Sequence, residues 1–260
     1  ARFALSPAYA RLDVVGAVSD DDAARFPLLG VPRSRVRTTG DARFDQVWGR
    51  VQAARRGGGA MALAERLRAE RGFTLVAGST WPPDERLLAP AFAGVRSAGP
   101  ARLIVAPHEP DEAHLTALER TLDHAGLDHV RLARVEAGDP PADVVVIDRV
   151  GVLADLYAAA DAAYVGGGFH RAGLHSVVEP AALEVPVLFG PRHGNAREAA
   201  ELAAAGGGWE VRDADTLAAA LLRLVGDAGA RAAAGAAALA YVQSRLGGAR
   251  ANAEALLELL

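Results

Sequence analysis

The segment from residue 166 to residue 180 holds the densest group of side chains that could bind a ligand. It reads Gly-Gly-Gly-Phe-His-Arg-Ala-Gly-Leu-His-Ser-Val-Val-Glu-Pro. Gly167 and Gly168 remove side chains where another group must come close. The segment is not the dinucleotide-binding fingerprint, because the third glycine of that pattern is missing. Ser176 and Glu179 have the spacing of a capping box, which predicts that a helix starts there.

Glu179 has two interpretations. In the first, its carboxylate reaches back to the N–H of Ser176 and only caps the helix. In the second, the carboxylate accepts hydrogen bonds from a ribose diol while the helix N-terminus binds a phosphate. His175 lies four residues before Glu179 and shares its face if the helix extends that far.

A second candidate loop reads Gly-Ser-Thr-Trp-Pro-Pro at residues 78–83 and follows an apolar run. The hydroxyls of Ser79 and Thr80 could donate to an anion, as could the free N–H groups of the next helix. The alternative is that Ser79 or Thr80 caps that helix, with proline in its first turn.

His108 follows the next apolar run and could hydrogen-bond a sugar or a phosphate. The alternative is a surface histidine or one satisfied within the core. No other histidine or acid has metal-ligand spacing with it, so we predict no metal. A further loop holds Arg149, Val150 and Gly151, whose backbone could read the edge of a nucleobase; a polar turn is the alternative.

The elements that position these loops follow from periodicity. Short apolar runs predict strands at 14–18, 73–77, 102–106, 130–133, 144–147, 162–165, 185–189 and 209–211. Helical spacing predicts helices at 60–70, 84–97, 111–125, 153–160, 178–183 and 196–205, with more helices from residue 216 on. This alternation predicts an α/β fold, a Rossmann-like parallel sheet with helices on both faces. Ligands of such sheets bind at the carboxyl ends of the strands, where the candidate loops lie.

Composition excludes several classes of protein. The 260 residues carry a net charge of −4, so no basic field favours nucleic acid. Cysteine is absent, which excludes disulfides, thiolate metal sites and thiol nucleophiles. Lysine is absent as well, which excludes a Walker A loop and a pyridoxal Schiff base, and no cofactor is expected. No apolar run reaches the roughly 18 residues of a membrane helix.

Taken in order, the motifs resemble the 3-deoxy-D-manno-octulosonic acid (Kdo) transferases of lipopolysaccharide assembly. The resemblance covers about residues 10–210. The motifs are Gly-Ser-Thr-Trp-Pro, Ala-Pro-His-Glu, Asp-Arg-Val-Gly, Tyr-Val-Gly-Gly-Gly-Phe, His-Ser-Val-Val-Glu-Pro-Ala, and Val-Leu-Phe-Gly-Pro with Asn195. Two departures are Ser176, where family members usually carry asparagine, and a loop before His175 that is one residue longer.

The resemblance implies the C-terminal half of a GT-B glycosyltransferase, which has two Rossmann-like domains facing a cleft. Residues 1–38 would be the tail of the N-terminal acceptor domain, and residues 39–260 the nucleotide-sugar donor domain. The general base, the acceptor pocket and the membrane-associating segment would lie in the missing N-terminal half. No catalytic residue is therefore assigned here, and this chain alone is expected to be soluble and inactive.

The implied reaction is inverting, metal-independent transfer of Kdo from CMP-Kdo to a lipid A precursor, at the cytoplasmic face of the bacterial inner membrane. Ser79, Thr80 and His108 would hold the anionic groups of the donor. The backbone of residues 149–151 would contact cytosine, and Glu179 would hold the ribose hydroxyls. Further donor contacts are expected from Gly167, Gly168, His175, Ser176 and Asn195.

Two other functions compete with this one. The first is a GT-B domain for another nucleotide sugar, since Glu179 and the glycine-rich residues 166–175, called the glycine loop below, suit that equally well. The second is a non-catalytic nucleotide-binding module. The number of Kdo units transferred, the exact acceptor and the oligomeric state do not follow from the sequence.

Overall fold

The chain forms two compact units. The structure, a computed structural model, describes residues 2–57, 59–70 and 72–259. The smaller unit comprises Ala1–Arg50 with Val242–Leu260, and the larger comprises Val51–Tyr241. The helices α3 (Ala42–Gly57) and α12 (Ala228–Ser244) run across these boundaries. The predicted division at residues 38 and 39 stays a prediction.

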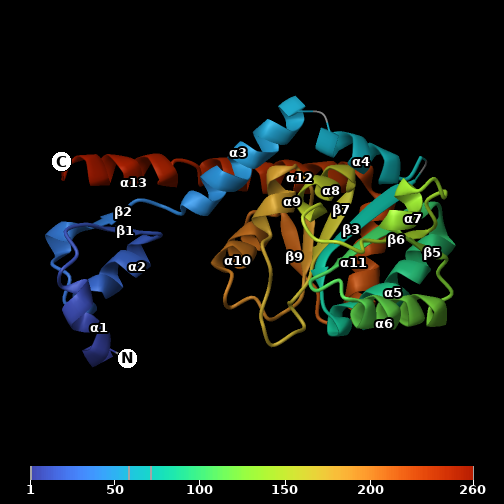
Figure 1. Cartoon of the computed structure of the whole chain (residues 1–260), viewed down its shortest axis with the longest axis horizontal. Coiled ribbons are helices and arrows are strands. Elements are labelled where there is room, and N and C mark those ends of the chain that lie inside the picture. The colour runs from blue at the N-terminus through green and yellow to red at the C-terminus, as the bar shows by residue number, and fades with distance from the viewer. Residues whose placement is uncertain (1, 58, 71, 260) are drawn as a thin grey trace. The chain divides into compact units, whose positions relative to one another are not determined.

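A seven-stranded sheet forms the centre of the larger unit (Figure 1). Its strand order is β5-β6-β4-β3-β7-β8-β9, and every pairing is parallel. The predicted parallel α/β fold is therefore confirmed. The strands are β3 (Phe73–Thr80), β4 (Ala101–Pro107), β5 (His129–Arg131), β6 (Val144–Val146), β7 (Ala162–Val165), β8 (Val187–Phe189) and β9 (Gly208–Glu210).

Both faces of this sheet are buried, because successive strand residues point to opposite sides. Leu75 and Leu103 join one core cluster, whereas Val76 and Ile104 join another. The first cluster packs under α5 (Pro82–Ala98), α6 (Glu112–His124) and α11 (Ala214–Gly226). The second packs under α4 (Gly59–Leu67), α7 (Leu132–Glu136) and α8 (Leu153–Leu156). Figure 1 shows α5 and α6 on one side of the strands and α4 and α8 on the other.

The start of α5 differs from the expectation. Strand β3 runs through Thr80, so Trp81 becomes the N-cap and Pro82 opens the helix. Neither Ser79 nor Thr80 caps it, and that alternative is wrong. The side chain of Asp84 stabilises the start of the helix instead, because its Oδ2 accepts a hydrogen bond from the N–H of the N-cap residue Trp81 at 2.9 Å.

Other boundaries shift by a few residues. The strand expected at 130–133 ends at Arg131, because Leu132 opens α7. The helix expected at 153–160 divides into α8 and a 3₁₀ turn at Tyr157–Ala159. The remaining helices of this unit are α9 (Val178–Ala182) and α10 (Arg197–Ala204).

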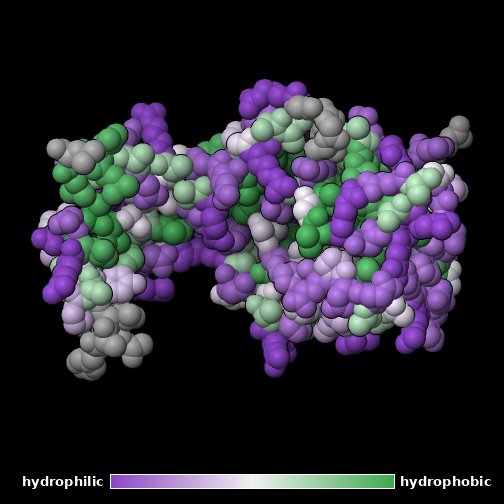
Figure 2. Space-filling view, in the orientation of Figure 1, coloured by the Kyte–Doolittle hydropathy of each residue, from purple (hydrophilic) through white to green (hydrophobic). Residues whose placement is uncertain are grey.

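The smaller unit contains a two-stranded parallel sheet of β1 (Val15–Ala17) and β2 (Val36–Thr38). Its helices are α1 (Arg2–Tyr9), α2 (Asp20–Arg25) and α13 (Gly248–Leu257), with 3₁₀ turns at Phe26–Leu29 and Arg33–Arg35. Ser19 caps α2 by accepting from the Asp22 N–H. Figure 2 shows hydrophobic side chains gathered on its surface. Leu28 and Leu257 are exposed hydrophobic residues of this unit. Among the helices that the structure describes, none is long and apolar enough to cross a membrane.

Candidate functional site

Four aromatic rings meet at the carboxyl ends of the central strands. Trp81 follows β3, His108 follows β4, and His170 and His175 follow β7. The Trp81 and His170 rings are stacked with centroids 4.1 Å apart, and Trp81 lies 4.8 Å from His108. The His108 and His175 rings are 4.3 Å apart. These four residues are called the ring cluster below. The cluster forms because β3 lies between β4 and β7 in the sheet.

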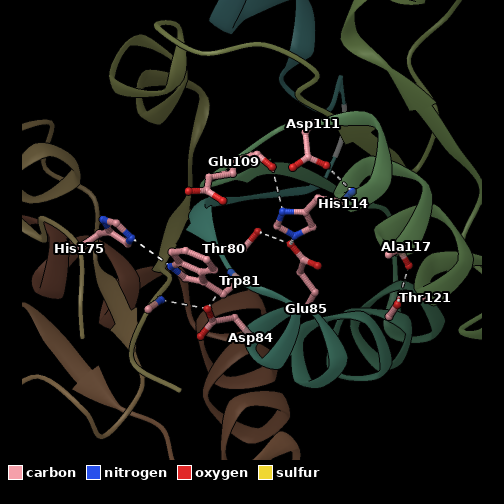
Figure 3. A network of polar contacts seen from close by, with 11 residues as sticks. Thr80, Trp81, Asp84, Glu85, Glu109, Asp111, His114, Ala117, Thr121 and His175 are labelled. Carbon is pink, nitrogen blue, oxygen red and sulfur yellow. Dashed lines mark hydrogen bonds and ion pairs between the residues drawn. The ribbon is translucent and has the colours of Figure 1, made fainter. Parts of the chain in front are cut away.

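His175 is held in its neutral form within this cluster. Burial lowers the pKa of His175, and the nearby His108 and His170 lower it further. The Trp81 Nε1–H lies 3.3 Å from Nε2 of His175 (Figure 3). An indole nitrogen can only donate, so this Nε2 accepts and the proton resides on Nδ1. His175 can therefore offer an N–H to a ligand.

The end of β3 is strained at Ser79. Its φ of 52° lies in the left-handed region, which a non-glycine residue rarely adopts. The pairing of β3 with β4 also shifts its register between Gly78 and Thr80. Such strain is typical of ligand-binding loops, and it turns the backbone of Ser79 out of the regular strand.

The glycines after β7 are required by close packing of backbone on backbone. A Cβ on Gly166 would lie 2.3 Å from the Ser79 carbonyl oxygen, and one on Gly168 would lie 2.5 Å from the Gly190 backbone. Gly167 has a φ of 93°, and its Cβ would lie 2.2 Å from the Gly173 carbonyl oxygen. The end of β3 and the loops after β7 and β8 therefore fit together only when these positions lack side chains.

Asp84 fastens the glycine loop to α5 from within the core. The residue is fully buried, and its Oδ2 accepts from the N–H of Trp81 and of Gly167 at 2.9 Å each. Its Oδ1 accepts from the Tyr164 hydroxyl at 2.8 Å. Burial raises the pKa of Asp84, and these donors oppose that rise. The carboxylate thus joins two of the candidate loops.

Thr80 is also engaged inside the protein. Its hydroxyl is buried and donates to Oε1 of Glu85 at 2.9 Å. The same carboxylate oxygen lies 2.9 Å from Nε2 of His114 on α6. The Thr80 hydroxyl is therefore directed into the protein, toward Glu85.

Asn195 holds the glycine loop from the other side. Its Oδ1 accepts from the Leu174 N–H at 3.0 Å, and its Nδ2 donates to the Leu174 carbonyl at 2.9 Å. A Cβ on Gly173 would lie 2.4 Å from the same amide oxygen. Asn195 therefore fixes the backbone just before His175.

The loop of residues 149–151 lies after β6. The Arg149 guanidinium pairs with Glu136, with Nη2 2.7 Å from Oε1. Val150 is 75% exposed. Gly151 has a φ of 93° and open space around its Cβ position. An exposed apolar side chain beside a glycine with open space around it suits contact with a flat ligand surface.

The expected capping box at α9 does not form, and that interpretation of Ser176 and Glu179 is wrong. The helix begins at Val178 with Val177 as its N-cap, and none of the described side chains caps it. Ser176 is exposed, and Glu179 is half-buried. Glu179 lies near Tyr157, whose pKa is raised by burial and further by the Glu179 charge.

The structure thus brings together Ser79, His108, Gly167, Gly168 and His175 around three neighbouring strand ends. Sequence reasoning missed several residues that build this site: Trp81, Asp84, Glu85, His114, Tyr164 and His170. Trp81 and His170 stood inside the quoted motifs and could have been found as aromatic residues following strands. Among the described residues, no group of three or more histidine and acidic side chains could hold a metal ion.

Solved structures with the same fold include two nucleotide-sugar proteins. The C-terminal CMP-Kdo binding domain of WaaA from Acinetobacter baumannii matches 71% of this chain and 96% of its own, with a TM-score of 0.62 and 23% identity. The UDP-GlcNAc 2-epimerase of Neisseria meningitidis matches 95% of this chain and 61% of its own, with a TM-score of 0.64 and 13% identity. The fold is that of the C-terminal half of a GT-B glycosyltransferase, as predicted.

Sequence comparison gives the family. The 3-deoxy-D-manno-octulosonic acid transferase of Bordetella pertussis is 34% identical over 99% of this chain and 59% of its own length. The enzyme of the same name from Aquifex aeolicus is 28% identical over 60% of this chain and 42% of its own. No family model matches. The chain belongs to the Kdo transferase family, as its motifs predicted, and spans about three fifths of the Bordetella relative.

Proposed function

We propose that this chain binds CMP-Kdo at the ring cluster and the glycine loop. The proposal is supported by the family and by the convergence of the ring cluster, the strained Ser79 and the glycine loop at one sheet edge. Of these, the convergence carries the most weight, because ligands of parallel sheets bind where neighbouring strands end. The whole protein would transfer Kdo to a lipid A precursor at the cytoplasmic face of the inner membrane, with inversion and without a metal.

The proposed roles follow the geometry. Ser79, His108 and the neutral His175 would donate to the phosphate and the sugar carboxylate. The backbone at residues 149–151 would contact cytosine, with Val150 against its face, and Glu179 would accept from the ribose hydroxyls. Ser176 would add a polar contact from its exposed position.

Other predicted contacts receive supporting roles. Thr80 and Asn195 already use their polar atoms on Glu85 and Leu174, so we assign them to holding the loops. Gly167 and Gly168 keep the donor-facing backbone free of side chains. We expect this chain alone to bind the donor without transferring its sugar, because the general base is expected outside it.

Titration calorimetry tests the donor class. CMP should bind this chain more tightly than UMP does, and EDTA should leave the affinity unchanged. A preference for UMP or UDP would favour another nucleotide sugar, the alternative considered from the sequence. Turnover of CMP-Kdo with a lipid A precursor by the full-length enzyme then tests the reaction.

A further inference from the structure

His114 makes two contacts that suit a doubly protonated ring. Its Nδ1 lies 2.9 Å from the Glu109 carbonyl oxygen, and its Nε2 lies 2.9 Å from the Oε1 of Glu85 (Figure 3). A carbonyl oxygen and a carboxylate oxygen can only accept. With Glu85 ionised, both hydrogen bonds therefore form together only when the imidazole carries a proton on each nitrogen.

These contacts are sheltered from solvent. The side chain of His114 is 10% exposed, and that of Glu85 is 3% exposed. A buried carboxylate needs charged or strongly polar partners, and Glu85 receives donors from His114 and from the Thr80 hydroxyl. Loss of the imidazolium charge would leave Glu85 poorly compensated.

The position of His114 joins two of the loops of the candidate site. Glu109 is the neighbour of His108, and Thr80 is the neighbour of Trp81 and Ser79. The His108 and Trp81 rings are 4.8 Å apart, so their separation depends on how the two loops are held. His114 links one loop through the Glu109 carbonyl and the other through Glu85.

We propose that His114, as an imidazolium, is a positioning residue that holds the His108 loop against the end of β3, so that the shape of the donor site depends on its protonation. The first half of the proposal, that His114 holds the His108 loop, rests on the contacts described above. The consequence for donor binding rests on the proposed function.

The charged groups that face His114 are acidic. Glu85 reaches it from α5, and Asp111 precedes it at the N-cap of its own helix, where Oδ1 accepts from the His114 N–H. Glu109 faces it through its backbone carbonyl. The hydrogen bond to Glu85 raises the pKa of His114 above 6.5, and Asp111 adds to that rise.

Nuclear magnetic resonance across pH 5–10 tests the loop-holding part. In the unaltered chain, the amide signals of residues 107–110 should shift with the same midpoint as the His114 ring signal, above pH 6.5. His114→Gln should abolish this pH-dependent shift of the loop signals. His124→Gln changes an exposed histidine of the same helix and should leave the shift in place. The proposal would be overturned if the loop signals do not shift at the midpoint of His114, or if they still shift at that midpoint in H114Q.

A second variant keeps the test decisive if H114Q does not fold. Glu85→Gln preserves the shape of the side chain and removes its charge. The midpoint of His114 should then fall, and the midpoint of the loop signals should fall with it. Separate movement of the two midpoints would equally contradict the proposal.

CMP affinity measured across the same pH range tests the functional consequence. Relative to H124Q, the H114Q variant should bind CMP about tenfold more weakly at pH 6, the equivalent of one ligand hydrogen bond. The two variants should converge as His114 loses its proton. Equal affinities at pH 6 would overturn this part. If no variant binds CMP, the proposed function fails while the loop signals still decide the inference.

Discussion

The indole of Trp81 stacks on the imidazole of His170, with ring centroids 4.1 Å apart and ring planes inclined by 15°. Trp81 follows β3 and His170 follows β7, so the contact joins the loops of two paired strands. The same indole donates to His175. Trp81 is therefore the residue that organises the ring cluster.

Trp81→Phe should raise the pKa of His175. Phenylalanine keeps a ring against His170, but it removes the donor that favours the neutral imidazole of His175. The titration of the His175 ring signal measures this. Trp209→Phe, in edge strand β9, is the matched control and should leave that titration unchanged. An unaltered His175 midpoint in W81F would argue against the indole–imidazole hydrogen bond.

The stability difference between the unaltered chain and His114→Gln should depend on pH. The folded-state pKa of His114 is raised, so its contribution is fully present below the unfolded pKa of about 6.5 and is lost as pH rises through the raised value. Urea unfolding should show H114Q less stable by about 1–3 kcal/mol at pH 6. The deficit should shrink by pH 9, and a constant deficit would point to packing alone.

Asp84→Ala should destabilise the larger unit by about 3 kcal/mol, because it leaves the Tyr164 hydroxyl and two backbone N–H groups without their buried acceptor. Chemical unfolding measures the loss. Asp213→Ala removes an exposed helix cap and should cost much less stability than Asp84→Ala. Similar losses for the two variants would mean that Asp84 acts merely as a cap.

Gly166→Ala and Gly94→Ala should change stability in opposite directions. A Cβ at Gly166 would lie 2.3 Å from the Ser79 carbonyl oxygen, so the end of β3 and the loop after β7 must separate. Gly94 lies in the interior of α5 with open space at its Cβ position, and alanine there should add about 1 kcal/mol. Thermal unfolding distinguishes them, and a stable G166A would refute the tight loop packing.

Glu179→Ala should weaken CMP binding by about 1–3 kcal/mol, because two ribose hydroxyls would lose their acceptor. Calorimetry with CMP measures the change. Ser176→Ala is the control for helix capping, and it should leave the stability of α9 unaltered because Val177 is the N-cap. Full CMP affinity in E179A would remove Glu179 from the proposed site.

Periodicity predicted most elements of the larger unit, since the alternation of apolar runs and helical patterns is written locally in the chain. Strand β7 was found with the observed bounds, and β3, β4 and β6 within a few residues. The predicted capping box at Ser176 failed because the helix begins beyond it, at Val178. Val177 and Val178 are buried in the core, and this packing sets where α9 starts. The four-residue capping pattern contains no information on that packing.

Local patterns and motifs read in order were enough to predict the alternating elements, the parallel fold and the family. Three contacts could be seen only in the folded chain: Trp81 meets three histidines, Asp84 accepts from the glycine loop, and His114 bridges two loops. These contacts depend on the order of strands in the sheet. It places β3 between β4 and β7, and so brings together loops that are far apart along the chain.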